Sequence, residues 1–222
     1  LGSRLRNKYL GTFGNYGSYS FYYSHQITSG EGGMVTCNKK EDYDILFALR
    51  SHGWLGGTRH YKRSLKSYNH YAKQNPQLDP RYIFINSGFN LRPTDIQAAI
   101  AHNQFNRLEY LKKFRNMNRN LLIKKITKSK KWNNQFEFIA VPKNIDPSWM
   151  GLPILISEKF KDKKKRFINY LDKIGIETRP IISGNFANQP AARLYKLCKK
   201  NEQFGNSQKV QELGFLIGLH TK

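Results

Sequence analysis

The sequence predicts an α/β protein, and three observations support this class. Two short apolar runs flank a glycine-rich turn between residues 15 and 37, which is typical of two strands. A long amphipathic helix is predicted to begin after a capping box formed by Thr94 and Gln97. Nearer the C-terminus, a strand–helix–strand order between residues 152 and 181 indicates a small α/β layer.

The N-terminal elements follow from local periodicity. Residues 15–23 alternate small or polar with aromatic side chains, and residues 33–37 form a second apolar run, so each predicts a strand. Apolar residues at helical spacing predict a helix over residues 41–50. Residues 54–81 have no sustained period, which predicts a loop-like segment that acts as a lid, an interface or a disordered stretch.

The helix after Pro93 is predicted to be long and to join two domains. Its apolar face consists of Ile96, Ala99, Ile100, Leu108, Leu111, Phe114, Met117 and Leu121. Further on we expect strands over residues 136–141 and 152–156, a helix over 162–174 that ends at Gly175, and a strand over 176–181. The predicted domains are residues 1–120 and 121–222.

The formal net charge of +23 permits two interpretations. It favours a polyanionic partner if the cations gather on one face, as in nucleic-acid-binding proteins. However, the lysines are spread over the whole chain beside many asparagines and isoleucines, as expected of an AT-rich coding sequence. We therefore interpret the charge as composition, with solvated lysines on several faces.

The cysteine and apolar content excludes several classes of protein. Cys37 and Cys198 are the only two cysteines, so neither a disulfide framework nor a cysteine-based metal site is predicted, and a reducing compartment is favoured. No window approaches the roughly 18 consecutive apolar residues that a membrane span requires. The chain begins at Leu1 and stops after an apolar run, and we expect it to be a fragment.

A histidine stands between the first predicted strand and the glycine-rich turn. Glycines at positions 30, 32 and 33 allow tight turning or close approach to a ligand. The hydroxyl side chains around His25 could hold a phosphate or a polar ring; they are Ser20, Ser24, Thr28 and Ser29. Alone, such a histidine is more often a surface or core residue than a catalytic one.

Several separated motifs resemble the DegT/DnrJ/EryC1/StrS family of vitamin B6-dependent sugar aminotransferases and dehydratases. The motifs are SFYYSHQITSGEGGMVTCNKKEDYDILFALRSHGW, SGFNLRPTDIQAAIAHNQFNRLEYLKKFRNMNRN, GIETRPIISGN and GFLIGLH. The resemblance implies the aspartate-aminotransferase-like fold, which is fold type I of the pyridoxal-phosphate enzymes. Residues 1–120 would then be the later part of the large cofactor-binding domain with its linking helix, and residues 121–222 a truncated small domain.

The resemblance also implies a role for His25. In the family's aminotransferases this position is the lysine that forms a Schiff base with pyridoxal 5'-phosphate, which an imidazole cannot do because the reaction needs a primary amine. The histidine resembles the 3-dehydratase branch, in which pyridoxamine 5'-phosphate enters untethered. There His25 would be the base at the cofactor and the acid for the departing C3 hydroxyl of a nucleotide-linked 4-keto-6-deoxyhexose.

Five other residues match the family position by position. Ser20 would contact the cofactor phosphate, and Asn90, beside Phe89 in place of a tyrosine, would reach the cofactor of the neighbouring subunit in a homodimer. Arg179, Asn185 and His220 would lie on the substrate side. The loop after residue 54 carries no cysteine, so the iron–sulfur type of dehydratase is not implied. The remaining type uses L-glutamate as amino donor in deoxysugar (O-antigen or lipopolysaccharide) biosynthesis.

Two other functions stay open. One is a sugar aminotransferase of the same family or an inactive paralogue, and the other is a basic nucleic-acid-binding protein. The second has no zinc spacing, RNP-like strand or concentrated basic helix, so no nucleic-acid partner is expected. We expect a cytoplasmic protein whose 222 residues are inactive alone, because the family's upstream half holds the aspartate that pairs with the cofactor's pyridine nitrogen.

Overall fold

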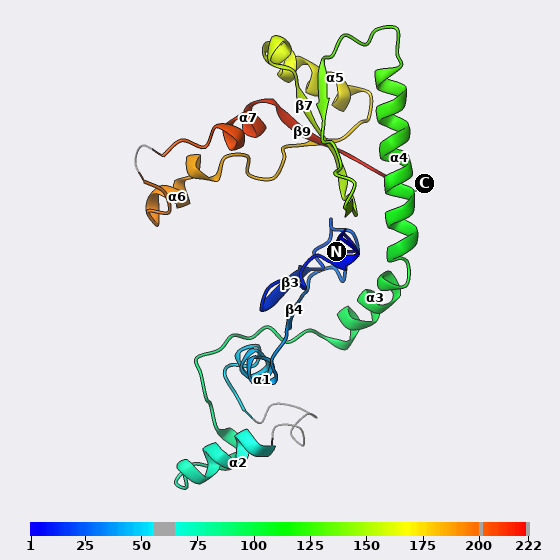
Figure 1. Cartoon of the computed structure of the whole chain (residues 1–222). Helices are drawn as coiled ribbons and strands as arrows, with labels where there is room; N and C mark the ends of the chain where they lie inside the picture. The colour runs from blue at the N-terminus through cyan, green and yellow to red at the C-terminus, as the bar shows by residue number, and fades with distance from the viewer. Residues whose placement is uncertain (56–64, 200–201, 221–222) are drawn as a thin grey trace. The chain divides into compact units, whose positions relative to one another are not determined.

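The computed structural model describes residues 1–55, 65–199 and 202–220 (Figure 1). These residues form two compact units. Unit 1 comprises Leu1 and Lys8–Asn106, and unit 2 comprises Gly2–Asn7 and Arg107–Lys222. Both units contain helices and strands, as predicted for an α/β protein. In the described ranges no helix is both long and apolar enough to cross a membrane.

Unit 1 begins with the short strand β2 (Lys8–Tyr9) and a hairpin. Strands β3 (Tyr16–Ser20) and β4 (Gly33–Cys37) pair antiparallel, with Ser20 opposite Gly33. Helix α1 (Lys40–Leu49) follows directly. These elements confirm the predicted strand, turn, strand and helix, because alternation and helical spacing are local patterns that this hairpin and helix obey.

The loop-like interpretation of residues 54–81 is wrong in part, since helix α2 (Leu65–Gln74) and the 3₁₀ turn η1 (Pro80–Tyr82) lie in it. Tyr71 and Ala72 of α2 pack against a small core of Leu55 and Ile83. The helix therefore depends on tertiary contacts, which a local search for periodicity does not detect. Residues 56–64 of the predicted loop lie outside the described residues.

The predicted single helix after Pro93 is two helices, α3 (Asp95–Phe105) and α4 (Leu108–Thr127). Asn106 is the C-cap of α3 and Arg107 is the N-cap of α4, and the compact units divide between these two residues. Burial differs sharply across this break: Ile96 is 74% exposed, whereas Leu111 is 8% exposed. The apolar stripe is continuous in sequence but serves two units, so its period could not reveal the break. The predicted domain boundary after residue 120 falls inside α4.

The capping box at the start of α3 is confirmed. The Thr94 hydroxyl accepts a hydrogen bond from the Gln97 backbone N–H (3.3 Å), and the Thr94 N–H donates to Gln97 Oε1 (2.9 Å). No residue of α3 is buried, so the cap stabilises its first turn without help from a buried side chain of the helix.

We expect Thr94→Ala to destabilise the first turn of α3 by about 1 kcal/mol, because the amide at position 97 loses its acceptor. Hydrogen exchange of the amides in residues 95–98 should become about fivefold faster. Thr94→Ser keeps the hydroxyl and is the matched control. Unchanged exchange in Thr94→Ala would contradict the stabilising role of the cap.

Unit 2 is built on an antiparallel sheet with strand order β5-β7-β9-β8. The strands are β5 (Phe136–Phe138), β7 (Gly151–Ile156), β8 (Thr178–Arg179) and β9 (Gly214–Gly218). Its core combines Leu152, Ile154, Ile156 and Phe215 with side chains from helices α4 and α5 (Lys164–Lys173). The predicted strands and helix are confirmed here, although β5 and β8 are shorter than predicted.

The remaining elements of unit 2 are short. Strand β1 (Arg4–Leu5) pairs antiparallel with β6 (Ile145–Asp146). The 3₁₀ helices η2 (Glu158–Lys163) and η3 (Phe186–Asn188) precede α5 and α6 (Pro190–Leu194) respectively. Helix α7 (Gly205–Leu213) runs directly into β9. The segments that carry Asn185 and His220 thus lie on either side of α7 in sequence.

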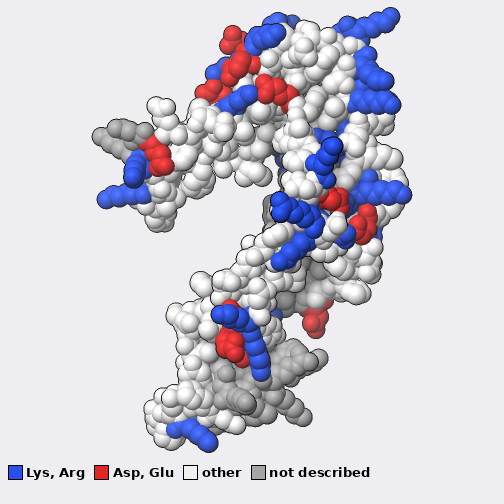
Figure 2. Space-filling view, in the orientation of Figure 1, with Lys and Arg blue, Asp and Glu red and all other residues white. Residues whose placement is uncertain are grey.

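Basic side chains occur on both units in the space-filling view (Figure 2). On that face Lys and Arg are interspersed with Asp and Glu instead of forming one continuous patch. This distribution agrees with the compositional interpretation of the +23 charge.

Candidate functional site

The connection between β3 and β4 is a folded loop. The Phe21 N–H donates to the Gly32 carbonyl (2.9 Å), and the Ser29 N–H donates to the Phe21 carbonyl (2.9 Å). Ile27 and Ser29 are buried at 3% and 5% exposure. These contacts give the loop a defined conformation, which a catalytic group on it requires.

His25 lies in a turn of this loop and is partly exposed. Its backbone N–H donates to the Tyr22 carbonyl (3.1 Å), and its ring meets the Tyr22 ring edge-on with 5.8 Å between centroids. Within the described part of the chain, neither imidazole nitrogen forms a hydrogen bond. Both ring nitrogens are therefore available to exchange protons with a bound molecule.

Ser20 is exposed at the end of β3, where the loop begins. Its Oγ accepts a hydrogen bond from the Tyr22 N–H (3.3 Å), so the hydroxyl proton remains free to be donated. A neutral donor of this kind suits a phosphate oxygen. The loop thus presents a donor and a proton-transfer group from one short segment.

Asn90 lies in a different segment of unit 1, and backbone contacts hold it in place. Its main chain forms an antiparallel bridge with Ser51, and the flanking Phe89 carbonyl accepts from the His52 N–H (2.8 Å). The Asn90 side chain is exposed and forms no hydrogen bond with the described residues. Its amide is free to bind a ligand or a second subunit.

Gln97 connects these two segments, and the sequence indicated only its capping role. Its Nε2 donates to the backbone carbonyl of Glu31 (3.0 Å), so the first turn of α3 is held to the glycine-rich turn. The contact joins residues far apart in sequence, so no local sequence pattern predicts it. This hydrogen bond therefore anchors the loop that bears His25 to helix α3, which follows Asn90 in the sequence.

The groups in unit 1 fit an untethered, phosphate-bearing cofactor. Ser20 and Asn90 are exposed neutral donors, and His25 can take up and release a proton. Residues 20–34 contain no lysine, so the loop offers no primary amine for covalent attachment. Among the described residues, no three His, Cys, Asp or Glu side chains are grouped to hold a metal ion.

The predicted substrate-side residues all lie in unit 2. Arg179 in β8 is exposed, and its guanidinium pairs with Glu177 (Nε to Oε1, 2.9 Å). His220 follows β9, is exposed, and places its ring against Gly218; its carbonyl accepts from the Asn118 amide. No hydrogen bond joins Arg179, Asn185 and His220 to one another in the described ranges, so their common role stays a prediction.

Asn185 differs from these two because it is buried, at 6% exposure. Its Nδ2 donates to Gln208 Oε1 (3.1 Å), and its Oδ1 accepts from the Ala187 N–H (3.2 Å). Its backbone N–H donates to Gln211 Oε1 (3.1 Å). Both ends of the side chain are thus engaged inside the chain, which gives Asn185 a structural role and leaves its predicted substrate contact untested.

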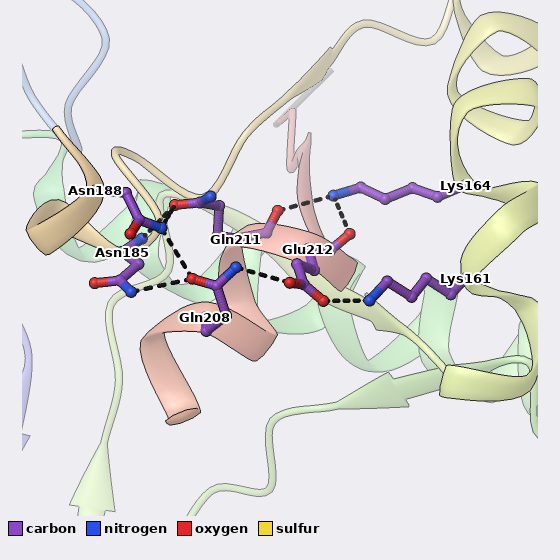
Figure 3. Close-up of polar contacts among 7 residues, drawn as sticks. All are labelled: Lys161, Lys164, Asn185, Asn188, Gln208, Gln211 and Glu212. Atoms are coloured by element: carbon purple, nitrogen blue, oxygen red, sulfur yellow. Dashed lines mark hydrogen bonds and ion pairs between the residues drawn. The ribbon is translucent and has the colours of Figure 1, made fainter. Parts of the chain in front are cut away.

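A chain of side-chain hydrogen bonds, here called the ladder, continues from Asn185 along α7 (Figure 3). Gln208 Oε1 also accepts from Asn188 (2.9 Å), and Gln208 Nε2 donates to Glu212 (2.7 Å). Glu212 forms an ion pair with Lys161 of η2. These residues were missed from the sequence, although the spacing of Gln208, Gln211 and Glu212 places them on one face of a helix.

Glu212 makes the stability of this ladder depend on pH. The hydrogen bond from Gln208, followed by that from Lys161, lowers the pKa of the Glu212 carboxyl below its ordinary value. A lowered folded-state pKa stabilises the fold above the unfolded pKa, and this contribution is lost as pH falls through the folded value. We expect the melting temperature to fall more steeply in the wild type than in Glu212→Gln as the pH drops below the ordinary pKa of a glutamate carboxyl. Parallel pH profiles for the two proteins would contradict this.

A family model, described as the DegT/DnrJ/EryC1/StrS aminotransferase family, matches residues 1–222. GDP-4-keto-6-deoxy-D-mannose 3-dehydratase of Escherichia coli O55:H7 is 29% identical over 221 residues, covering 99% of this chain and 54% of its own. dTDP-4-dehydro-2,6-dideoxy-D-glucose 3-dehydratase of Saccharopolyspora spinosa is 31% identical (99% and 47%). The lipopolysaccharide biosynthesis protein RfbH of Salmonella typhimurium is 30% identical (99% and 50%). The chain spans about half the length of these relatives.

Solved structures show the same fold. Escherichia coli GDP-4-keto-6-deoxy-D-mannose-3-dehydratase with bound hydrated PLP matches with a TM-score of 0.77 at 25% identity, covering 99% of this chain and 54% of that chain. A histidine-to-asparagine variant of GDP-4-keto-6-deoxymannose-3-dehydratase (ColD) with bound GDP-perosamine matches with a TM-score of 0.81 at 27% identity, covering 99% and 54%. The predicted aspartate-aminotransferase-like fold is confirmed by these matches.

Proposed function

Because the chain belongs to the DegT/DnrJ/EryC1/StrS aminotransferase family, we propose that it is part of a pyridoxamine-phosphate-dependent 3-dehydratase of a nucleotide-linked 4-keto-6-deoxyhexose. The observation that carries the proposal is His25, an imidazole free of hydrogen bonds within the described residues, on a folded loop that has no lysine. Two relatives that match 99% of this chain are named as 3-dehydratases. A dehydratase needs a proton-transfer group here and no amine.

We assign a separate task to each residue of unit 1. The Ser20 hydroxyl would donate to the cofactor phosphate, and the Asn90 amide would reach the phosphate held by a second copy, which makes the enzyme a homodimer. His25 would remove a proton from the C4′ carbon of the cofactor and deliver a proton to the departing C3 hydroxyl. The electron sink for this loss of hydroxyl is what pyridoxamine phosphate supplies when bound.

The residues of unit 2 would face the substrate. Arg179 and His220 are exposed and could contact the nucleotide or the sugar, whereas Asn185 would act through the segment that it stabilises. L-glutamate is the proposed amino donor that converts the cofactor back to pyridoxamine phosphate. The proposed location of the protein is the cytoplasm. The similarity to RfbH supports a place in lipopolysaccharide-type deoxysugar biosynthesis.

A second candidate is a nucleotide-sugar aminotransferase of the same family, or an inactive paralogue. It is supported by GDP-perosamine synthase of Escherichia coli O157:H7, which is 40% identical over 70 residues, 32% of this chain. The two candidates differ in what happens to the sugar. A dehydratase removes the C3 oxygen, whereas an aminotransferase adds nitrogen.

The test uses the protein expressed from the complete reading frame that contains these 222 residues. It is supplied with pyridoxamine phosphate, L-glutamate and a panel of nucleotide-4-keto-6-deoxyhexoses, and the products are identified by mass spectrometry. We expect a sugar that lacks the C3 oxygen, together with 2-oxoglutarate and ammonia. An amino sugar would establish the second candidate instead, and a folded dimer without any product would indicate an inactive paralogue.

A further inference from the structure

We propose that Gln208 and Gln211 of α7 are positioning residues for substrate binding. They hold residues 182–188 in a strained backbone conformation, which presents the Ile182 side chain for contact with the nucleotide sugar. This role rests on the proposed function, which puts the segment around Asn185 on the substrate side. The observations that support it are a strained turn at Ile182 and a set of hydrogen bonds that holds the chain directly after this turn.

The turn at Ile182 is unfavourable for an isoleucine. The Gly184 N–H donates to the Ile181 carbonyl (3.1 Å), which makes Ile182 the first central residue of a turn. Its φ is +48°, in the left-handed region that glycine adopts readily and that a β-branched residue avoids. Its side chain is 79% exposed, the highest value among the large apolar residues of the described chain. Neither the backbone nor the side chain of Ile182 stabilises the fold, which is typical of a residue kept for binding.

Two glutamine carbonyl groups hold the chain directly after this turn (Figure 3). The buried Asn185 donates from Nδ2 to Gln208 Oε1 (3.1 Å) and from its backbone N–H to Gln211 Oε1 (3.1 Å). The Nδ2 of Asn188 donates to the same two oxygens, at 2.9 Å and 3.2 Å. Gln208 and Gln211 are three residues apart and therefore lie on one face of α7. We call this pair the glutamine clamp.

Glu212 fixes the direction of the Gln208 amide. Gln208 Nε2 donates to Glu212 Oε1 (2.7 Å), and Glu212 is held in turn by its ion pair with Lys161. Because an ionised carboxylate only accepts hydrogen bonds, the NH₂ group of Gln208 must face Glu212 and its carbonyl oxygen must face Asn185. The amide cannot turn over without losing the hydrogen bonds at both of its ends.

Close packing on both sides of Ile182 keeps the turn from relaxing. Gly184 has φ of +60°, and a Cβ atom there would lie 2.7 Å from Gln211 Cβ. On the other side, a Cβ atom at Gly214 would lie 2.8 Å from Ile181 Cδ1, so Ile181 packs against the first residue of β9. Both neighbouring positions are therefore fixed, and the strain remains at Ile182 as long as the glutamine clamp is intact.

The first test is Gln211→Leu in the protein expressed from the complete reading frame, with the product assay described above. The variant loses the acceptor for the Asn185 N–H. We expect the KM for the nucleotide sugar to rise about tenfold with kcat within about twofold, and hydrogen exchange of residues 184–188 to become about tenfold faster. Gln211→Glu keeps the acceptor oxygens and should restore both values to within about threefold of the wild type. A merely structural role would lower kcat through loss of folded enzyme and leave KM unchanged.

A second variant separates contact with the substrate from folding. Ile182→Gly removes the side chain, but glycine accepts the positive φ, so the melting temperature should not fall. The KM should still rise at least about fivefold, because the apolar contact is lost. Gln203→Leu is the matched control for Gln211→Leu. Gln203 is exposed and forms no hydrogen bond with the described residues, so its replacement should change KM less than about twofold.

The proposed function and the glutamine clamp are tested separately. No product from the wild type would refute the proposed function, and hydrogen exchange in Gln211→Leu would still decide whether the clamp holds residues 184–188. Unchanged exchange in this variant would refute the clamp. If the wild type forms product, an unchanged KM in Gln211→Leu would refute the positioning role, and an unchanged KM in Ile182→Gly would refute the contact of Ile182 with the substrate.

Discussion

Replacing His25 by asparagine should lower the rate of the proposed C3 deoxygenation at least about 100-fold in the protein expressed from the complete reading frame. Asparagine has nearly the size of histidine and can form hydrogen bonds, but it cannot take up and release a proton near neutral pH. No other side chain between positions 20 and 34 is a base with an ordinary pKa near neutrality. The measurement is the initial rate of product formation at saturating substrate.

Two companion variants make this result specific. Tyr23→Phe changes a neighbour that is 72% exposed and should leave the rate within about twofold of the wild type. His25→Lys supplies a primary amine and should yield an adduct that borohydride traps, with a shift of product toward an amino sugar. If His25→Asn is folded and keeps most of its activity, the proton-transfer group lies elsewhere and the assignment of His25 is wrong.

Replacing Gly53 by alanine should destabilise unit 1 by about 3 kcal/mol, the largest stability effect that we expect. Gly53 has φ of +81°, and a Cβ atom there would lie under 3.0 Å from the Asn86 carbonyl oxygen. Gly88 packs against Gly53 just as tightly, since a Cβ added to Gly88 would lie under 3.0 Å from the Gly53 nitrogen. Both obstacles are backbone atoms, so a side chain cannot move aside to make room.

The consequence extends to Asn90, the residue proposed to contact the cofactor, because the backbone on either side of it bonds to the segment that contains Gly53. The Phe89 carbonyl accepts from the His52 N–H, and the Leu91 N–H donates to the Arg50 carbonyl (2.9 Å). Gly53→Ala should therefore lower the affinity for pyridoxamine phosphate. It should also lower the midpoint of chemical denaturation. The matched control is Gly14→Ala, where the nearest atom would be 3.6 Å away. A midpoint for Gly53→Ala within error of this control would contradict the packing argument.

The features that could be predicted from the sequence are those decided within a few residues. The β3–β4 hairpin, helix α1 and the capping box of Thr94 and Gln97 follow from alternation, helical spacing and side-chain to backbone hydrogen bonds over three positions. The family motifs likewise placed Ser20, His25 and Asn90 as candidates, and the structure shows all three with groups free to bind. Local order was enough for the hairpin, the helix and the cap, whereas the three site candidates came from the resemblance to the family.

Other features required the tertiary structure. Helix α2 depends on its packing against Leu55 and Ile83, and the break between α3 and α4 occurs where one apolar stripe passes from unit 1 to unit 2. The hydrogen bond from the Asn185 side chain to Gln208 of α7 likewise joins residues that are distant in sequence.

The sequence by itself therefore determined the hairpin, helix α1 and the capping box, because turns, caps and periodicity are short-range properties of the chain. The fold class and the proposal that His25 transfers protons came from the family motifs instead. Only the tertiary structure decided which polar groups are engaged and which are left free, as with Asn185 and His25. The physical reason is that hydrogen-bond partners and burial depend on residues distant in sequence. A short segment considered alone does not determine which distant residues will surround it.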